Sequence, residues 1–154
     1  LGAPPRRDHV VYVTGVLSGP RFQSWLFPGV AETLQHLTDA GLYVGIIANT
    51  HVPGWVMDRN FRGVELLQHF SDRVYSGDEG VEKPDPQIFR IAEQRSQMVG
   101  KRLIYMGDRV DKDVTGAANA GWDSILFRSV LSTSEGQATF EIDHWSELPD
   151  LLLS

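Results

Sequence analysis

Short apolar runs recur along the chain, and each is closed by glycine or by polar residues. Runs of this kind, rich in β-branched and aromatic side chains, are typical of the buried strands of a parallel sheet. The pattern predicts strands over residues 10–13, 42–48, 73–76, 103–106 and 124–127, and a last short strand over 140–142.

Between these runs the apolar positions recur at helical spacing. The clearest helix runs from Val30 to Ala40 and is followed by Gly41, a favourable C-terminal cap. Further helices are predicted over 64–70, 87–98, 113–120 and 145–153, whereas 53–62 is predicted to be irregular or weakly helical. Strands that alternate with helices predict an α/β fold: a three-layer Rossmannoid parallel sheet with helices on both faces.

Polar residues follow several of the predicted strands directly. Thr14 follows the first strand, Asn49 and Thr50 follow the second, and Asp108 follows the strand over 103–106. Ligands of open parallel sheets bind beyond the carboxyl ends of the strands. We therefore expect these residues, together with Lys83 from the polar loop over 78–86, to converge on one site.

Length and composition limit the classes of protein that remain. With 154 residues, 42% hydrophobic and 22% charged, the chain suits one globular domain over 8–154 with a flexible tail over 1–7. Because cysteine is absent, disulfides, thiolate zinc sites and a cysteine nucleophile are excluded. The net charge of −6 argues against nucleic-acid binding. No membrane-spanning run or secretion signal is found, which predicts a cytoplasmic location.

Three aspartates and one lysine are the strongest candidates for chemistry. Carboxylates at a strand end, here Asp108, Asp111 and Asp113, suit a hard cation such as Mg²⁺. For Asp111 and Asp113 the alternative is that they stabilise the first turn of the next helix. Lys83 could hold a phosphate as a point charge, or it could be merely solvated.

Other polar and aromatic residues near this edge each allow a functional and a structural interpretation. Asn49 and Thr50 either bind a phosphate oxygen or form a turn. His51 is better explained as a surface histidine, since the five histidines show no metal-ligand spacing. The aromatic residues of the segment 18–27, namely Phe22, Trp25 and Phe27, suit a core or a lid rather than a base-stacking platform.

Several segments, taken in their order along the chain, resemble motifs of the haloacid dehalogenase (HAD) superfamily of phosphohydrolases. Together they span nearly the whole chain. Residues 80–89 are similar to the third motif with its phosphate-binding lysine, and 107–121 resemble the fourth, metal-binding motif. Residues 27–41 resemble the helix before the second motif, and 142–149 resemble the usual C-terminal ending.

The resemblance implies a mechanism in which an aspartate at the end of the first strand takes the phosphoryl group and water then hydrolyses it. It implies that Asp108 binds Mg²⁺ directly, that Asp113 acts in the outer shell of the metal, and that the backbone carbonyl of Thr14 is a further ligand. It also implies that Lys83 binds the phosphate. The catalytic set is then Thr14, Lys83, Asp108 and Asp113, with Asn49 and Thr50 beside the phosphate.

The first and second motifs depart from the family pattern. Tyr12 stands where the nucleophilic aspartate belongs, although Thr14 and the residues after it fit the family. A single aspartate between Tyr12 and Val13 would restore the motif, so either that residue is missing from the printed sequence or the chain has lost its nucleophile. In the second motif, Ala48 replaces the usual serine or threonine.

Three functions follow from these observations. The first is a Mg²⁺-dependent phosphomonoester phosphatase, and the alternative is a catalytically inactive HAD-like domain that binds a ligand or a protein. A receiver-type phospho-acceptor domain fits less well, because Lys83 precedes Asp108. The length leaves room only for a short flap at 18–27 and no full cap domain. Such an open site suits a phosphorylated small molecule, a bulky phospho-substrate, or a homo- or hetero-oligomer that covers it.

Overall fold

The computed structural model describes residues 10–13, 26–128 and 137–154. These residues form one six-stranded sheet in which all neighbouring strands pair in parallel. The strands are β1 (Val10–Val13), β2 (Tyr43–Ala48), β3 (Asp72–Tyr75), β4 (Leu103–Gly107), β5 (Asp123–Phe127) and β6 (Phe140–Ile142). The predicted α/β fold with a parallel sheet is therefore confirmed.

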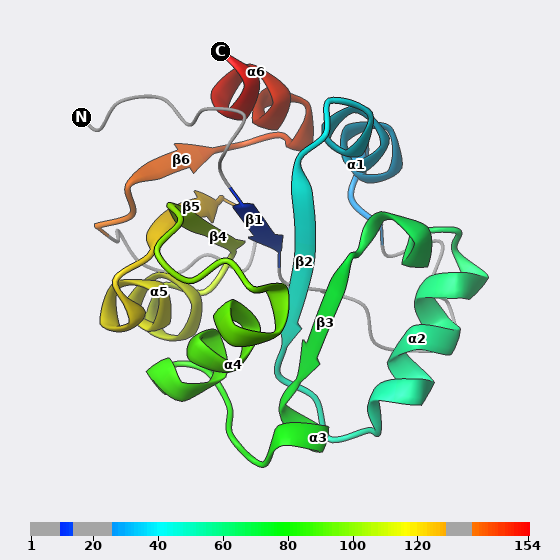
Figure 1. The fold of residues 1–154 in the computed structure, drawn as a ribbon. Coiled ribbons are helices and arrows are strands. Elements are labelled where there is room, and N and C mark those ends of the chain that lie inside the picture. Colours follow the sequence, from blue (N-terminus) through cyan, green and yellow to red (C-terminus); the bar gives the residue numbers. More distant parts are fainter. Residues whose placement is uncertain (1–9, 14–25, 129–136) are drawn as a thin grey trace.

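The order of the strands changes direction in the middle of the sheet. Along the sheet the order is β3-β2-β1-β4-β5-β6, so the chain builds outward from β1 in one direction and then returns to build in the other (Figure 1). The direction changes between β1 and β4. In doubly wound sheets the connections diverge at such a point and leave a ligand crevice beyond the carboxyl ends of the two strands.

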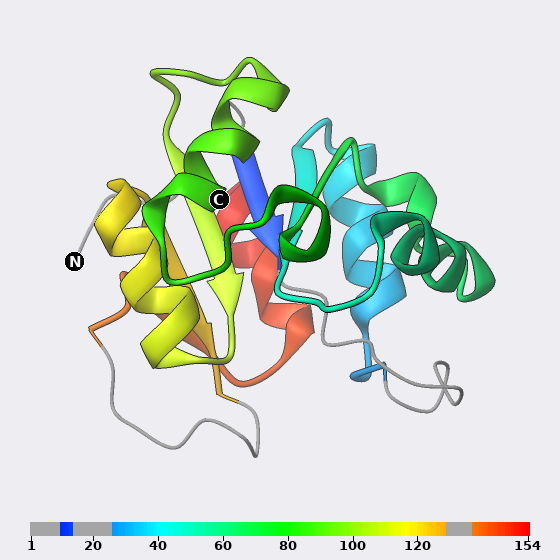
Figure 2. The same ribbon diagram turned by 90° about the horizontal axis from the view of Figure 1, so that it is seen from below.

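Helices cover both faces of the sheet (Figures 1 and 2). They are α1 (Val30–Asp39), α2 (Gly54–Gly63), α3 (Ser76–Glu79), α4 (Pro86–Ser96), α5 (Thr115–Ala120) and α6 (Leu148–Leu153). Apolar residues of α1, α2 and α6 form one core with one face of the sheet, and those of α4 and α5 form a second core with the other face. The burial of two separate apolar faces fixes the three-layer arrangement.

Two elements after β2 differ from the prediction. The residues predicted to be irregular or weakly helical form the regular helix α2, whose buried side chains Met57 and Phe61 lie one turn apart on its inner face. The helix predicted over 64–70 is reduced to a 3₁₀ turn at Leu67–His69. The short apolar stripe of α2 explains the first difference, because two inward-facing residues give a weak periodic signal.

Three further elements differ from the prediction. Helix α3 was not predicted. The helix predicted over 113–120 begins with a π-helical turn at Val110–Val114 and continues as α5. The C-terminal helix begins as a 3₁₀ turn at Trp145–Glu147 before α6.

Along the described part of the chain, no helix combines the length and the apolar character needed to cross a bilayer.

Candidate active site at the carboxyl edge of the sheet

Three charged side chains are buried at the carboxyl edge of the sheet. Lys83, Asp108 and Asp113 are only 3%, 5% and 2% exposed, and they are the only lysine, arginine or acidic residues buried within the described ranges. Charged groups are rarely buried unless they are paired, because desolvation is costly. Two of the three lie just after β4 and the third precedes α4, so the fold brings together residues that the sequence predicted to converge.

Lys83 is held deep in the protein, where Asp113 and Tyr105 are among its partners. Its Nζ donates hydrogen bonds to Asp113 Oδ1 and to the hydroxyl of Tyr105, each over 2.6 Å. The Tyr105 hydroxyl in turn donates to the backbone carbonyl of Ile47 over 2.9 Å. Burial lowers the pKa of Lys83, and the carboxylate of Asp113 opposes that change. The ammonium group is thus fixed at the end of β2 and β4.

Tyr105 is a member of this site that sequence reasoning missed. It lies in the middle of an apolar run and is fully buried, with its ring packed edge-on against Phe89 at a centroid distance of 5.1 Å. A tyrosine in such a run is ordinarily explained as core packing. Two observations could have indicated its role. A buried phenol needs a hydrogen-bond partner, and this tyrosine lies two residues before Gly107, near the polar end of the strand.

Asn49 fixes the backbone on which Lys83 sits. Its side-chain oxygen accepts a hydrogen bond from the backbone N–H of Lys83 over 2.9 Å, and its amide nitrogen donates to the carbonyl of the same residue over 3.0 Å. Both polar atoms of Asn49 are therefore engaged with the chain. In the next position, the hydroxyl of Thr50 accepts from the N–H of Val52 over 3.1 Å and forms a turn.

A wide turn brings Asp113 back toward the end of β4. The N–H of Val114 bonds to the carbonyl of Arg109, which is the spacing of a π-helical turn, and the Arg109 N–H donates to Asp113 Oδ2 over 2.9 Å. The carboxylate then lies directly against Gly107, where any Cβ would overlap it. Such π-helical turns often occur at functional sites.

We predict that Gly107→Ala destabilises the protein by about 3 kcal/mol, because the added methyl group pushes Asp113 away from Lys83. Chemical denaturation measures the change. The matched control is Gly63→Ala at the end of α2, where the new methyl group meets nothing within 4 Å and the change should be within about 0.5 kcal/mol of neutral. Equal stability of the two variants would contradict this account of the turn.

The charges of the described site fit a divalent cation. Two buried carboxylates face one buried ammonium group, so the cluster retains a negative charge that a cation would offset. Asp111 does not join them: it is exposed and paired with Arg109, which lowers the pKa of its carboxyl group. The described residues alone do not gather three carboxylates or histidines around one point. Thr14, whose backbone carbonyl is a predicted ligand, lies outside the described residues.

Tyr12 belongs to the core and not to the active-site edge. It is fully buried, and its hydroxyl donates to the carbonyl of Ala92 in α4 over 3.2 Å. Its ring packs against Trp122 at a centroid distance of 5.2 Å, and burial raises the pKa of the phenol. Tyr12 thus points into the α4 side of the sheet and cannot act as a nucleophile. The next residue, Val13, pairs with Met106, two residues before Asp108.

Only the end of the predicted flap over 18–27 can be placed. Phe27 packs edge-on against Phe127 at a centroid distance of 4.8 Å, and Leu26 and Phe27 both adjoin the larger core. Phe27 is therefore partly buried against this core. Phe22 and Trp25 lie outside the described residues.

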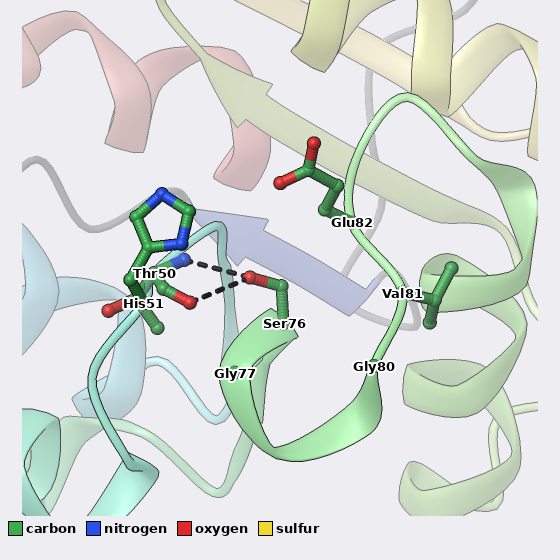
Figure 3. Close-up of a pocket in the computed structure, with 7 residues that line it drawn as sticks. All are labelled: Thr50, His51, Ser76, Gly77, Gly80, Val81 and Glu82. Atoms are coloured by element: carbon green, nitrogen blue, oxygen red, sulfur yellow. Dashed lines mark hydrogen bonds between the residues drawn. The ribbon is translucent and has the colours of Figure 1, made fainter.

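A cavity of about 300 Å³ lies beside the candidate site (Figure 3). Two of its lining residues are neighbours, along the chain, of residues at the candidate site: Thr50 follows Asn49, and Glu82 precedes Lys83. His51, predicted to be a surface histidine, is exposed and lines this cavity. The lining residues are Thr50, His51, Ser76, Gly77, Gly80, Val81 and Glu82.

Comparisons with known proteins find relatives that are named phosphatases. The chain is 33% identical over 135 residues to glyceraldehyde 3-phosphate phosphatase of Methanothermobacter thermautotrophicus, covering 82% of this chain and 58% of the relative. It is 33% identical over 114 residues to phosphoserine phosphatase of Thermus thermophilus, covering 74% of this chain and 45% of the relative. The chain therefore spans about half the length of these curated relatives.

A solved structure and a family model identify the same superfamily. The structure of a HAD phosphatase from Thermococcus onnurineus superimposes with a TM-score of 0.70 at 26% sequence identity, covering 81% of this chain and 57% of the other. The family model of the haloacid dehalogenase-like hydrolases matches residues 20–121. The chain thus belongs to the haloacid dehalogenase-like hydrolases.

Proposed function

We propose that this chain is the core of a Mg²⁺-dependent phosphomonoester phosphatase. The observation that carries the proposal is the buried cluster of Lys83, Asp108 and Asp113 at the point where the strand order changes direction. A phosphate needs a fixed positive charge, and a divalent cation needs oxygen ligands. The cluster offers both at one edge of the sheet. The names of the two curated relatives support a phosphorylated small molecule as substrate.

Each residue of the cluster has a separate role in the proposal. Asp108, with Asp113 beside it and the backbone carbonyl of Thr14, would hold Mg²⁺. When bound, the ion supplies positive charge that offsets the charge of phosphoryl transfer. Lys83 would steady the phosphate oxygens as a point charge. Asn49 would act through Lys83, because its side chain holds the lysine backbone, and Thr50 would add a hydroxyl beside the phosphate.

The nucleophile of the proposal is an aspartate directly after Tyr12, at the end of β1. In the printed sequence Val13 occupies that place. The packing of Tyr12 against Trp122 and Ala92 anchors the strand one residue before this point. An aspartate that followed Tyr12 would leave that packing unchanged, so the described strand is compatible with its presence.

We further propose that residues 8–154 form one core domain; the predicted tail over 1–7 and most of the predicted flap over 18–27 lie outside the described residues. An open site at this edge would admit a bulky phospho-substrate, or would be completed by another subunit. A cytoplasmic location remains a prediction, as does the lack of nucleic-acid binding, which rests on the net charge of −6.

Phosphate release by the wild-type protein tests the proposed function. With Mg²⁺ present, we expect inorganic phosphate to be released from a generic phosphomonoester such as p-nitrophenyl phosphate. Chelation should abolish the release, and added Mg²⁺ should restore it, because Asp108 and Asp113 lose the cation that offsets their charge. Turnover that continues unchanged after chelation would contradict the proposal.

The second candidate function is an inactive HAD-like domain that binds a ligand or a partner protein. The core position of Tyr12 favours it, because the phenol cannot replace the aspartate. The mass of the intact protein separates the two candidates. A mass greater than that of the printed sequence by one aspartate residue supports the phosphatase. A mass that equals the printed sequence, together with no turnover across a panel of phosphoesters, supports the binding domain.

A further inference from the structure

The cavity beside Lys83 is built from three segments that meet beyond the carboxyl ends of β2 and β3. One wall is formed by Thr50 and His51 after β2, the floor by Ser76 and Gly77 of α3, and the other wall by the segment 80–82 (Figure 3). The segment 80–82 leads directly into Lys83 and Thr50 directly follows Asn49, so the cavity adjoins the residues of the proposed phosphate site.

The floor of the cavity is fixed by hydrogen bonds between the loops. The N–H of Thr50 donates to the Ser76 hydroxyl over 2.8 Å, and that hydroxyl donates to the carbonyl of Thr50 over 3.1 Å (Figure 3). At Gly77, any Cβ would press on the carbonyls of Thr50 and Val52. The N–H of Gly54 donates to Asp78 Oδ1 over 3.0 Å. These contacts make a preformed cavity, which lowers the ordering cost of binding.

The lining of the cavity is polar and carries an acidic group. Val81 is the one apolar side chain among the lining residues. The hydroxyl group of Thr50 belongs to one wall, and that of Ser76 belongs to the floor. His51 and Glu82 lie on opposite sides (Figure 3). Within the described ranges, the carboxylate of Glu82 forms no ion pair.

The acidic side chains around the cavity differ in their partners. Glu79 is paired with Arg95 over 2.6 Å, and Asp78 is bonded to the backbone of Gly54. Among these three carboxylates, Glu82 is thus the one that lines the cavity and forms no ion pair with a described residue. A second carboxylate brought there by a ligand would meet this charge, whereas an ammonium group would be attracted by it.

We propose that this cavity is the subsite for the leaving group, and that it selects phosphomonoesters whose alcohol carries ammonium or hydroxyl groups over those whose alcohol carries a carboxylate. Glu82 is the residue that sets the preference. The inference rests on the proposed function, because it assumes that the phosphate is held at Lys83. It names the class of substrate that the site accepts.

Two probes of equal length test the subsite: phosphoethanolamine, which carries an ammonium group, and phosphoglycolate, which carries a carboxylate. Their dissociation constants are measured by titration calorimetry with Mg²⁺ present, and phosphate release is followed in the same samples. We expect the wild-type protein to bind phosphoethanolamine about fivefold more tightly or better. Glu82→Gln should reduce that preference about two- to fivefold, because it removes the charge and keeps the shape.

The matched control is Glu65→Gln, which makes the same chemical change at an exposed residue before β3, beyond the opposite end of that strand. It should leave the preference unchanged. Binding of both probes with no preference, or a preference that survives Glu82→Gln, overturns the subsite while the phosphate site stands. Failure of both probes to bind overturns the phosphate site, and with it both the proposed function and this inference.

Discussion

Replacing Lys83 by methionine is expected to lower the free energy of unfolding by about 3–5 kcal/mol, because it leaves the buried carboxylate of Asp113 without its cation. Methionine has a similar length and keeps the apolar contacts of the lysine stem, so the loss reports the charge. The ammonium group also joins Asp113 to Tyr105, and its removal deletes the hydrogen bond that it donates to that hydroxyl. Phosphate binding should be lost together with stability.

Two controls separate the charge of Lys83 from its shape. Lys101→Met, at an exposed position just before β4, should change stability by less than about 0.5 kcal/mol. The double variant Lys83→Met with Asp113→Asn should recover most of the loss, because neither partner then carries an unpaired buried charge. Urea denaturation measures all three. A Lys83→Met protein as stable as the wild type would show that the pair is not a buried ion pair in solution.

The second large effect is expected on catalysis. Asp108→Asn keeps the size of the side chain but removes the negative charge that the proposal assigns to Mg²⁺. We expect phosphate release to fall by about a thousandfold, which corresponds to about 4 kcal/mol of transition-state stabilisation. The fold should be retained, since the variant removes one of two buried carboxylates that face a single lysine.

The layered fold could be predicted from the sequence because its strands are short apolar runs that glycine or polar residues close. Buried parallel strands have this pattern, and the helices between them have a clear apolar stripe in α1 and α4. The order of the strands could not be predicted in the same way. It depends on which strands pair across the sheet, and pairing is decided by packing between distant segments.

Helix α2 shows where the pattern is too weak. Its inner face is carried by Met57 and Phe61, while Trp55 on the same helix is 68% exposed. Apolar residues on both sides of a helix blur the period of 3.6 residues from which helices are recognised. Tertiary packing against α1 and the sheet, rather than the local pattern, accounts for this helix.

The candidate site divides in the same manner. Lys83, Asp108 and Asp113 could be predicted from the sequence because charged residues follow strands or lie in a proline-rich loop, where they stand out. The roles of the Tyr105 hydroxyl and of the Asn49 side chain could not be predicted. Each forms hydrogen bonds with Lys83, which is far away in the chain. Their partners become visible only when β2 and β4 lie on either side of β1.

Phosphate release by the wild-type protein, Asp108→Asn and Asp111→Asn, assayed side by side with Mg²⁺, tests the account most directly. Asp111 is the matched control, because it lies three residues from Asp108 but is exposed and paired with Arg109. We expect turnover by the wild type, turnover within about twofold of it for Asp111→Asn, and a loss of about a thousandfold for Asp108→Asn. Equal rates for the two variants, or no release by the wild type, would contradict it.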